Sequence, residues 1–215
     1  MSTTFARSVA RLVGAAALIA GALSAAACIQ QETRSVMYLG PDGSVTWSIL
    51  EGDVRSDAAT PAERAGEEED YRREMLADPT PLVTWLDSLG GRAIVRTVLK
   101  DTVPFETHTS ARFDRLDALL ASICQTVGAQ CVGTLTTDGR RTRMTVEEIS
   151  EADAGPDTDL RTVTSAIDGL RLVLGEGTFV EAVGFKIEDG RTAVLEDDVD
   201  TGPVRLVLAW EVQGR

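Results

Sequence analysis

The chain has 215 residues, and its 34 Asp and Glu residues outnumber its 21 Lys and Arg residues to give a formal net charge of −13. A chain this acidic lacks the basic footprint of nucleic-acid-binding proteins and is unsuited to charge attraction by anionic lipid. The length allows one good hydrophobic core or at most two small domains. We therefore expect a folded protein with no nucleic-acid partner.

The first 27 residues have the layout of a secretory signal. Arg7 and Arg11 supply positive charge, residues 12–27 are uncharged and mostly apolar, and three Ala residues precede Cys28. The apolar run is short for a transmembrane helix, which needs about 20 residues. A Cys after small residues resembles the lipobox of bacterial lipoproteins, although that family prefers Leu where Ala25 stands. The resemblance implies that residues 1–27 are removed and that Cys28 is diacylated.

This resemblance implies anchoring in a bacterial cell envelope. One acyl chain binds a membrane weakly, so stable anchoring takes at least two. In bacteria with two membranes, Asp after the Cys commonly retains a lipoprotein at the inner membrane, so Ile29 favours the outer membrane, on its periplasmic side or at the surface. We expect residues 28–35 to be a short tether and residues 36–215 a single domain. The alternative is an ordinary secretory signal in which Cys28 has no role.

Turn and capping residues mark the first elements. The turn-forming stretch 40–44 predicts a hairpin between two short strands. Thr60 and Thr80 each precede a Pro, which predicts two helix starts, and Glu63 completes a capping box at the first. That first helix is mostly charged, so we expect it to be exposed with a narrow apolar stripe.

The middle of the chain predicts two strands, a strong helix and a hairpin. The strands lie on either side of Pro104. Residues 114–127 have the most regular apolar face in the chain and predict a helix that packs on a sheet. Asp138-Gly139 predicts a hairpin turn, whereas the acidic stretch 147–159 is interpreted as a loop.

The C-terminal part predicts an antiparallel meander. Residues 160–168 are compatible with either helix or strand. Four strand-like segments separated by Gly-rich or acidic turns then follow, at 170–174, 178–187, 191–196 and 204–212. The predicted fold class is α+β: a mostly antiparallel sheet of hairpins and a C-terminal meander, with one face covered by two or three helices.

No catalytic motif is found in the sequence. It has neither a Gly-x-Ser-x-Gly elbow nor a phosphate-binding Gly-rich loop. His108 is the only histidine, so a triad or zinc site based on histidine has one candidate. Because His108 lies on the polar side of its predicted strand, an exposed strand residue is favoured over a general base or a pH-sensitive contact. We predict no enzyme, no cofactor and no metal.

The acidic clusters and the tryptophans each have a functional and a structural interpretation. Carboxylates cluster at 151–159 and 196–200 and suit Ca²⁺, but their spacing departs from the twelve-residue calcium loop, which favours solvated loops. The three tryptophans lie on apolar patterns, which favours core packing over a ligand pocket. They are Trp47, Trp85 and Trp210.

Cys124 and Cys131 remain once Cys28 is assigned to lipid. In an oxidising compartment such a pair can form a disulfide that closes a small loop. Two buried free thiols are the alternative, because a disulfide requires the two Cα atoms to lie close together.

The mature chain also resembles LppM-like bacterial lipoprotein domains. The shared features are the lipidated Cys, an early Asp42-Gly43-Ser44 turn, a helical middle and a last strand that carries Trp210. The resemblance implies an envelope-associated domain that binds lipid or a protein partner and is not an enzyme.

Three hypotheses of function follow. The first is an envelope lipoprotein, anchored through Cys28, that acts without catalysis by protein binding or envelope assembly. The alternative is a lipid- or small-ligand-binding module with a pocket between the sheet and helix 114–127. A hydrolase that uses two acidic residues ranks last, because the sequence locates no such pair.

Overall fold

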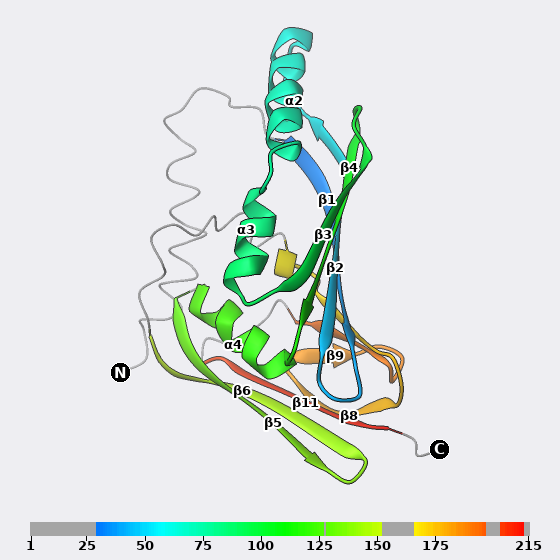
Figure 1. Ribbon diagram of the computed structural model, residues 1–215, viewed down its shortest axis with the longest axis vertical. Helices are drawn as coiled ribbons and strands as arrows, with labels where there is room; N and C mark the ends of the chain where they lie inside the picture. The colour runs from blue at the N-terminus through cyan, green and yellow to red at the C-terminus, as the bar shows by residue number, and fades with distance from the viewer. Residues whose placement is uncertain (1–28, 127, 152–165, 197–202, 213–215) are drawn as a thin grey trace.

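The computed structural model describes residues 29–126, 128–151, 166–196 and 203–212. The predicted α+β class is confirmed, but the described strands form two sheets in place of the single predicted sheet, together with three helices. The larger sheet runs along the molecule beside α2 and α3, and the smaller sheet lies at the end far from α2 (Figure 1). The helices are α2 (Pro61–Met75), α3 (Pro81–Ser88) and α4 (Leu116–Thr126).

The larger sheet has seven strands in the order β3-β4-β2-β1-β7-β10-β9. Every neighbouring pair is antiparallel except β1 and β7, which run parallel. The strands are β1 (Ile29–Leu39), β2 (Val45–Ser56), β3 (Arg92–Lys100), β4 (Phe105–Phe113), β7 (Arg171–Leu174), β9 (Phe185–Ile187) and β10 (Thr192–Leu195). The hairpin predicted around residues 40–44 and the two strands predicted on either side of Pro104 are confirmed, and these four strands form one end of this sheet.

The smaller sheet is antiparallel, with four strands in the order β5-β6-β11-β8. They are β5 (Ala129–Asp138), β6 (Arg141–Glu151), β8 (Thr178–Val183) and β11 (Arg205–Glu211). The β5–β6 hairpin is confirmed, and Gly139 adopts φ +59 in its turn. Residues 147–151, predicted as part of a loop, instead continue β6, because their backbone pairs with β5.

The C-terminal strands do not form a meander within one sheet. β8 pairs with β11 in the smaller sheet, whereas β7, β9 and β10 belong to the larger sheet. The predicted strand 178–187 is divided at Gly184, where φ is +74. A Cβ on Gly184 would lie 2.6 Å from the Cδ2 atom of Leu206. Gly is favoured here because it adopts a positive φ without strain, and the chain passes from one sheet to the other at this residue.

The main core joins both sheets with α3 and α4. Trp47 and Trp210 are fully buried and Trp85 is 8% exposed, which confirms that the tryptophans are core residues. The rings of Trp47 and Trp85 meet edge-on, with their centroids 5.5 Å apart. Such a contact adds to the free energy gained by burying the rings.

Local capping chemistry is also as predicted. The Thr60 side chain accepts a hydrogen bond from the Glu63 backbone N–H, and the Glu63 carboxylate accepts one from the Thr60 backbone N–H. Thr80 caps α3 in a similar way, through the N–H of Val83. These bonds satisfy backbone donors that the first turn of a helix leaves unpaired.

Candidate functional site

The first described residue, Ile29, begins β1, and Cys28 lies outside the described residues. Ile29 pairs with Ser56, and Ser35 pairs with Ile49, along the β1–β2 ladder. The predicted tether therefore does not hold for residues 29–35, which form the first half of β1. Their polar sequence conceals the strand because the ladder is made by backbone groups and not by an apolar face.

A second, smaller core lies where β1 begins, next to α2. Tyr71 and Met75 form the narrow apolar stripe predicted for α2, and the rings of Tyr71 and Phe105 lie 5.5 Å apart. This core thus links α2 to β2 and β4. Its buried members are Val54, Met75 and Phe105, packed by the partly buried Ile29, Tyr71 and Val98.

Polar contacts hold α2 over the end of β2. The Ser56 hydroxyl donates to the Glu67 carboxylate at 2.5 Å, and the Arg64 guanidinium donates to the Ala58 carbonyl at 2.8 Å. Glu67, one of the many charged residues of α2, therefore helps to hold the helix against β2 and is not only part of a solvated surface.

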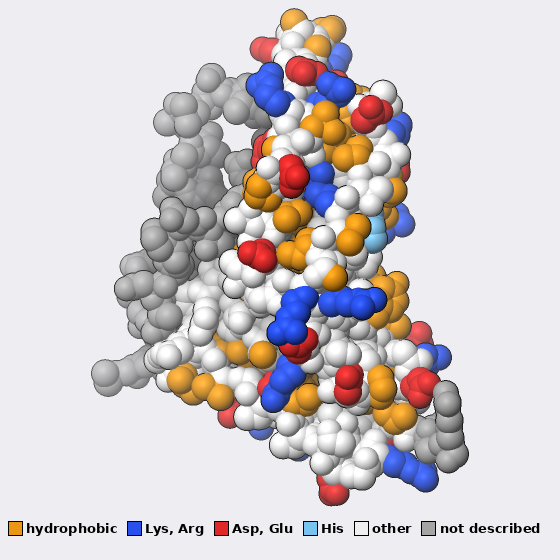
Figure 2. Space-filling model, in the orientation of Figure 1, with side chains coloured by type: hydrophobic (Ala, Val, Ile, Leu, Met, Phe, Trp, Pro, Cys, Tyr) orange, Lys and Arg blue, Asp and Glu red, His pale blue; other side chains and the backbone are white. Residues whose placement is uncertain are grey.

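A pocket of about 280 Å³ lies beside this second core. Its walls come from the end of α2, the α2–α3 connection, α3 and one face of β3. Hydrophobic side chains gather over the region of α3 and β3 on the face seen in Figure 2. The lining residues are Met75, Leu76, Ala77, Asp78, Thr80, Val83, Ile94, Arg96 and Val98.

Arg96 provides the cationic group in this pocket. One terminal nitrogen donates to the Met75 carbonyl at 2.5 Å. The buried Nε atom has no hydrogen-bond partner among the described residues. Asp78 is the acidic residue in the lining. The pocket therefore combines apolar walls with one guanidinium and one carboxylate, which suits a ligand with an apolar part and a polar end.

This pocket lies in a different place from the predicted one between the sheet and helix 114–127. The apolar face of α4 is packed into the main core, where the exposure of its Leu and Ile side chains ranges from 0% to 7%. Sequence periodicity identified the buried face of this helix, but it could not identify the strands that α4 packs on, which are chiefly β5 and β6 of the smaller sheet.

His108 contacts Ser48 across the β2–β4 pair, with 2.8 Å between His108 Nε2 and the Ser48 hydroxyl. Both side chains are half-buried. The prediction of an exposed strand residue is therefore wrong, because His108 is half-buried and has a partner that lies 60 positions away in the sequence. A single hydroxyl contact of this kind is common between neighbouring strands.

The remaining predicted sites are placed as follows. Cys124 and Cys131 are both buried and carry free thiols in this structure. Most of the two acidic clusters considered for Ca²⁺ lies outside the described residues. In the part of the chain that the structure describes, no group of three His, Cys, Asp or Glu residues could hold a metal ion.

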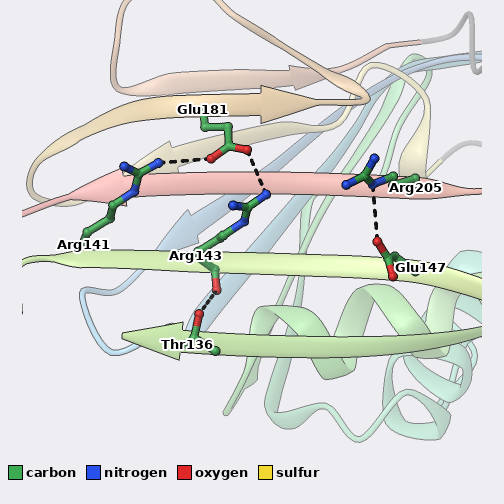
Figure 3. A network of polar contacts seen from close by, with 6 residues as sticks. All are labelled: Thr136, Arg141, Arg143, Glu147, Glu181 and Arg205. Carbon is green, nitrogen blue, oxygen red and sulfur yellow. Dashed lines mark hydrogen bonds and ion pairs between the residues drawn. The ribbon is translucent and has the colours of Figure 1, made fainter. Parts of the chain in front are cut away.

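Sequence reasoning missed an ionic network on the smaller sheet (Figure 3). Glu181 of β8 pairs with Arg141 at 3.1 Å and with Arg143 at 2.9 Å, both from β6. The three charges reach over β11, which lies between their strands. A second pair joins Arg205 to Glu147 at 3.3 Å. The only signal in the sequence was that charged residues recur at even spacings along β6, at 141, 143 and 147, and this spacing does not identify their partners.

The described residues thus form a two-sheet α+β protein with a small pocket near the place where β1 begins. None of its described helices is both long and apolar enough to cross a membrane. No protein-family model and no curated protein matches the chain.

Among solved structures, the chain is similar to the folded domain of LppM from Mycobacterium tuberculosis, determined by NMR. The sequences are 12% identical, the TM-score is 0.38, and the match covers 90% of this chain and 95% of that chain. A TM-score of this size carries no argument about function.

Proposed function

We propose that the chain is a bacterial envelope lipoprotein that is anchored through acylated Cys28 and acts by binding, without catalysis. One observation carries the proposal: a signal-like segment ends at Cys28, directly before a strand that is integrated into the larger sheet. Partner binding or envelope assembly is the proposed role, and the outer membrane is the proposed site in a bacterium with two membranes.

The position of Ile29 adds an orientation to this proposal. Because β1 begins at Ile29, no flexible tether separates it from an acyl anchor on Cys28. The anchor would therefore hold the start of β1, and α2 beside it, close to the lipid. Ile29 packs on the second core, whose members Met75 and Val98 also line the pocket. The pocket would therefore open near the membrane.

The anchor is tested with the wild-type chain and Cys28→Ser, each expressed in a bacterium with two membranes. For the wild type we expect an intact mass that shows cleavage before Cys28 and added acyl chains, and recovery with the outer membrane. The Cys28→Ser chain should lack the acyl mass. An unmodified Cys28 on an exported wild-type protein free of membranes contradicts the proposal.

The pocket supports a second candidate function, the binding of an amphiphile with an acidic end. Its apolar walls suit an alkyl chain, and Arg96 supplies a positive charge for a carboxylate or phosphate. Asp78 disfavours a second negative charge in the same place.

Lipids that co-purify with the chain, identified by mass spectrometry, test this second function. We compare the wild type with Arg96→Gln and use Arg92→Gln as the matched control, because Arg92 lies on the same strand but pairs with Asp114 outside the pocket. Loss of the bound lipid in Arg96→Gln alone supports the site. Equal lipid content in all three proteins contradicts it.

A further inference from the structure

Cys124 and Cys131 come from two elements that meet in the main core. Cys124 lies in the last turns of α4, and Cys131 lies near the start of β5. Each residue is only 6% exposed and belongs to the main core cluster. Gly128, with φ +87, turns the chain between α4 and β5 and so brings the two elements together.

The two thiols lie close enough for each to influence the pKa of the other. Both belong to one core cluster, on two elements that pack against each other. Glu148 stands opposite Cys131 in the β5–β6 ladder. No third metal-ligating side chain completes a site among the described residues, so the pair has no metal-binding geometry.

We propose that Cys124 and Cys131 form an intramolecular disulfide in the exported protein, which fastens the end of α4 to β5. The proposal rests on the export in the proposed function, because thiol pairs remain reduced in the cytosol. An external disulfide is the oxidant. One thiolate attacks it to form a mixed disulfide and release one thiol, and the second cysteine sulfur then displaces the other thiol. In all, the chain gives up two protons and two electrons, and the oxidant becomes two thiols.

Burial determines when this bond can form. Burial raises the pKa of both thiols, and the nearby Glu148 carboxylate raises it further. Thiols with raised pKa values supply little thiolate, so the folded, reduced protein should react slowly. Oxidation should therefore occur before the core closes, and the finished bond should resist reductants until the protein unfolds.

The bond would constrain a short loop of the unfolded chain. Closing such a loop and retaining the native packing should raise the Tm by about 5–10 °C. The rise should vanish in reduced protein and be absent from a Cys124→Ala/Cys131→Ala double variant, whose Tm should not respond to reductant.

The experiment has two arms, both on the full wild-type chain. In the first, exported protein is denatured with excess alkylating reagent and digested, and mass spectrometry looks for the linked peptides. In the second, protein reduced in denaturant refolds in mixtures of oxidised and reduced glutathione. We expect linked peptides in the first arm and, in the second, a bond that closes as refolding proceeds. We also expect alkylation of the reduced native protein to be at least tenfold slower than that of the unfolded protein.

The two arms separate the geometry of the pair from its compartment. Alkylated free thiols in both arms overturn the proposal. If the bond forms in glutathione but the protein isolated from cells has free thiols, the proposal is also overturned. In that case the pair has suitable geometry, and the proposed export to an oxidising compartment is what fails. Bonds of Cys124 or Cys131 to glutathione or to a second chain, in place of the intramolecular link, overturn the geometry.

Discussion

The indole N–H of Trp47 donates a hydrogen bond of 2.7 Å to the hydroxyl of Ser35, between β2 and β1. Trp47 is fully buried and Ser35 is 3% exposed. Ser35 thus occupies a core position because it satisfies a buried donor. Ser35 is one of the polar residues that make β1 hard to recognise in the sequence, yet the folded protein needs its hydroxyl as a hydrogen-bond acceptor.

Removal of this acceptor should destabilise the protein. Ser35→Ala leaves the Trp47 N–H buried and unpaired, which should lower the free energy of unfolding by about 1–3 kcal/mol. Denaturant titration followed by tryptophan fluorescence measures the change. Ser110→Ala, at a half-buried position on β4, is the control and should change stability by no more than about 0.5 kcal/mol. Equal effects of the two variants would contradict the role of the bond.

Gly133 permits close packing of α4 on β5. A Cβ at Gly133 would lie 2.3 Å from the backbone oxygen of Asp117 at the start of α4. Gly133→Ala should therefore push the helix away and cost about 1–3 kcal/mol of stability. Gly66→Ala is the matched control, since it lies in α2 with nothing within 4 Å of its Cβ, and it should stabilise the protein by roughly 0.5–1 kcal/mol. Thermal and denaturant unfolding report both, and a neutral Gly133→Ala would contradict the packing argument.

Two aspartates should make the stability sensitive to acid. The Ser44 hydroxyl and then its backbone N–H hold the pKa of Asp42 below its ordinary value of 3.8. The Arg191 backbone N–H and then the Thr192 hydroxyl do the same for Asp189. A carboxylate with a lowered native pKa stabilises the fold above its unfolded pKa, and this contribution is lost as the pH falls through the native pKa.

The sign of this effect gives a testable difference between variants. Asp42→Asn and Asp189→Asn should be less stable than the wild type near pH 7, and the difference should shrink as the pH falls below about 3.8. Urea midpoints measured between about pH 7 and pH 2.5 give the comparison. A difference that stays constant or grows in acid would show that the charge of these carboxylates is not what stabilises the two turns.

The ionic network of Figure 3 should contribute little to stability. Glu181 and its two Arg partners are 31%, 49% and 43% exposed, so water screens their interaction. Glu181→Gln should lower the free energy of unfolding by no more than about 1 kcal/mol, and less in about 1 M salt. Denaturant titration at two salt concentrations checks this, and a larger cost that persists in salt would indicate a structural role.

Local features of the sequence suffice to predict several of the helices and strands. Thr60 with Glu63, and Thr80 with Val83, cap the helix starts through hydrogen bonds made within one turn. The alternation from Phe105 to Phe113 and the apolar face of α4 identify which side chains are buried. These features depend on neighbours only a few residues apart, so propensity and periodicity suffice to predict them.

The way in which these elements combine depends on contacts between segments that are far apart in the sequence. The parallel β1–β7 pair, the passage between sheets at Gly184 and the extension of β1 to Ile29 depend on backbone partners that are distant in the sequence. The pocket around Arg96 arises for the same reason, because α2, the α2–α3 connection and β3 all contribute to it. Backbone pairing and side-chain contact between distant segments leave no periodic signal in the sequence, so only the folded chain specifies them.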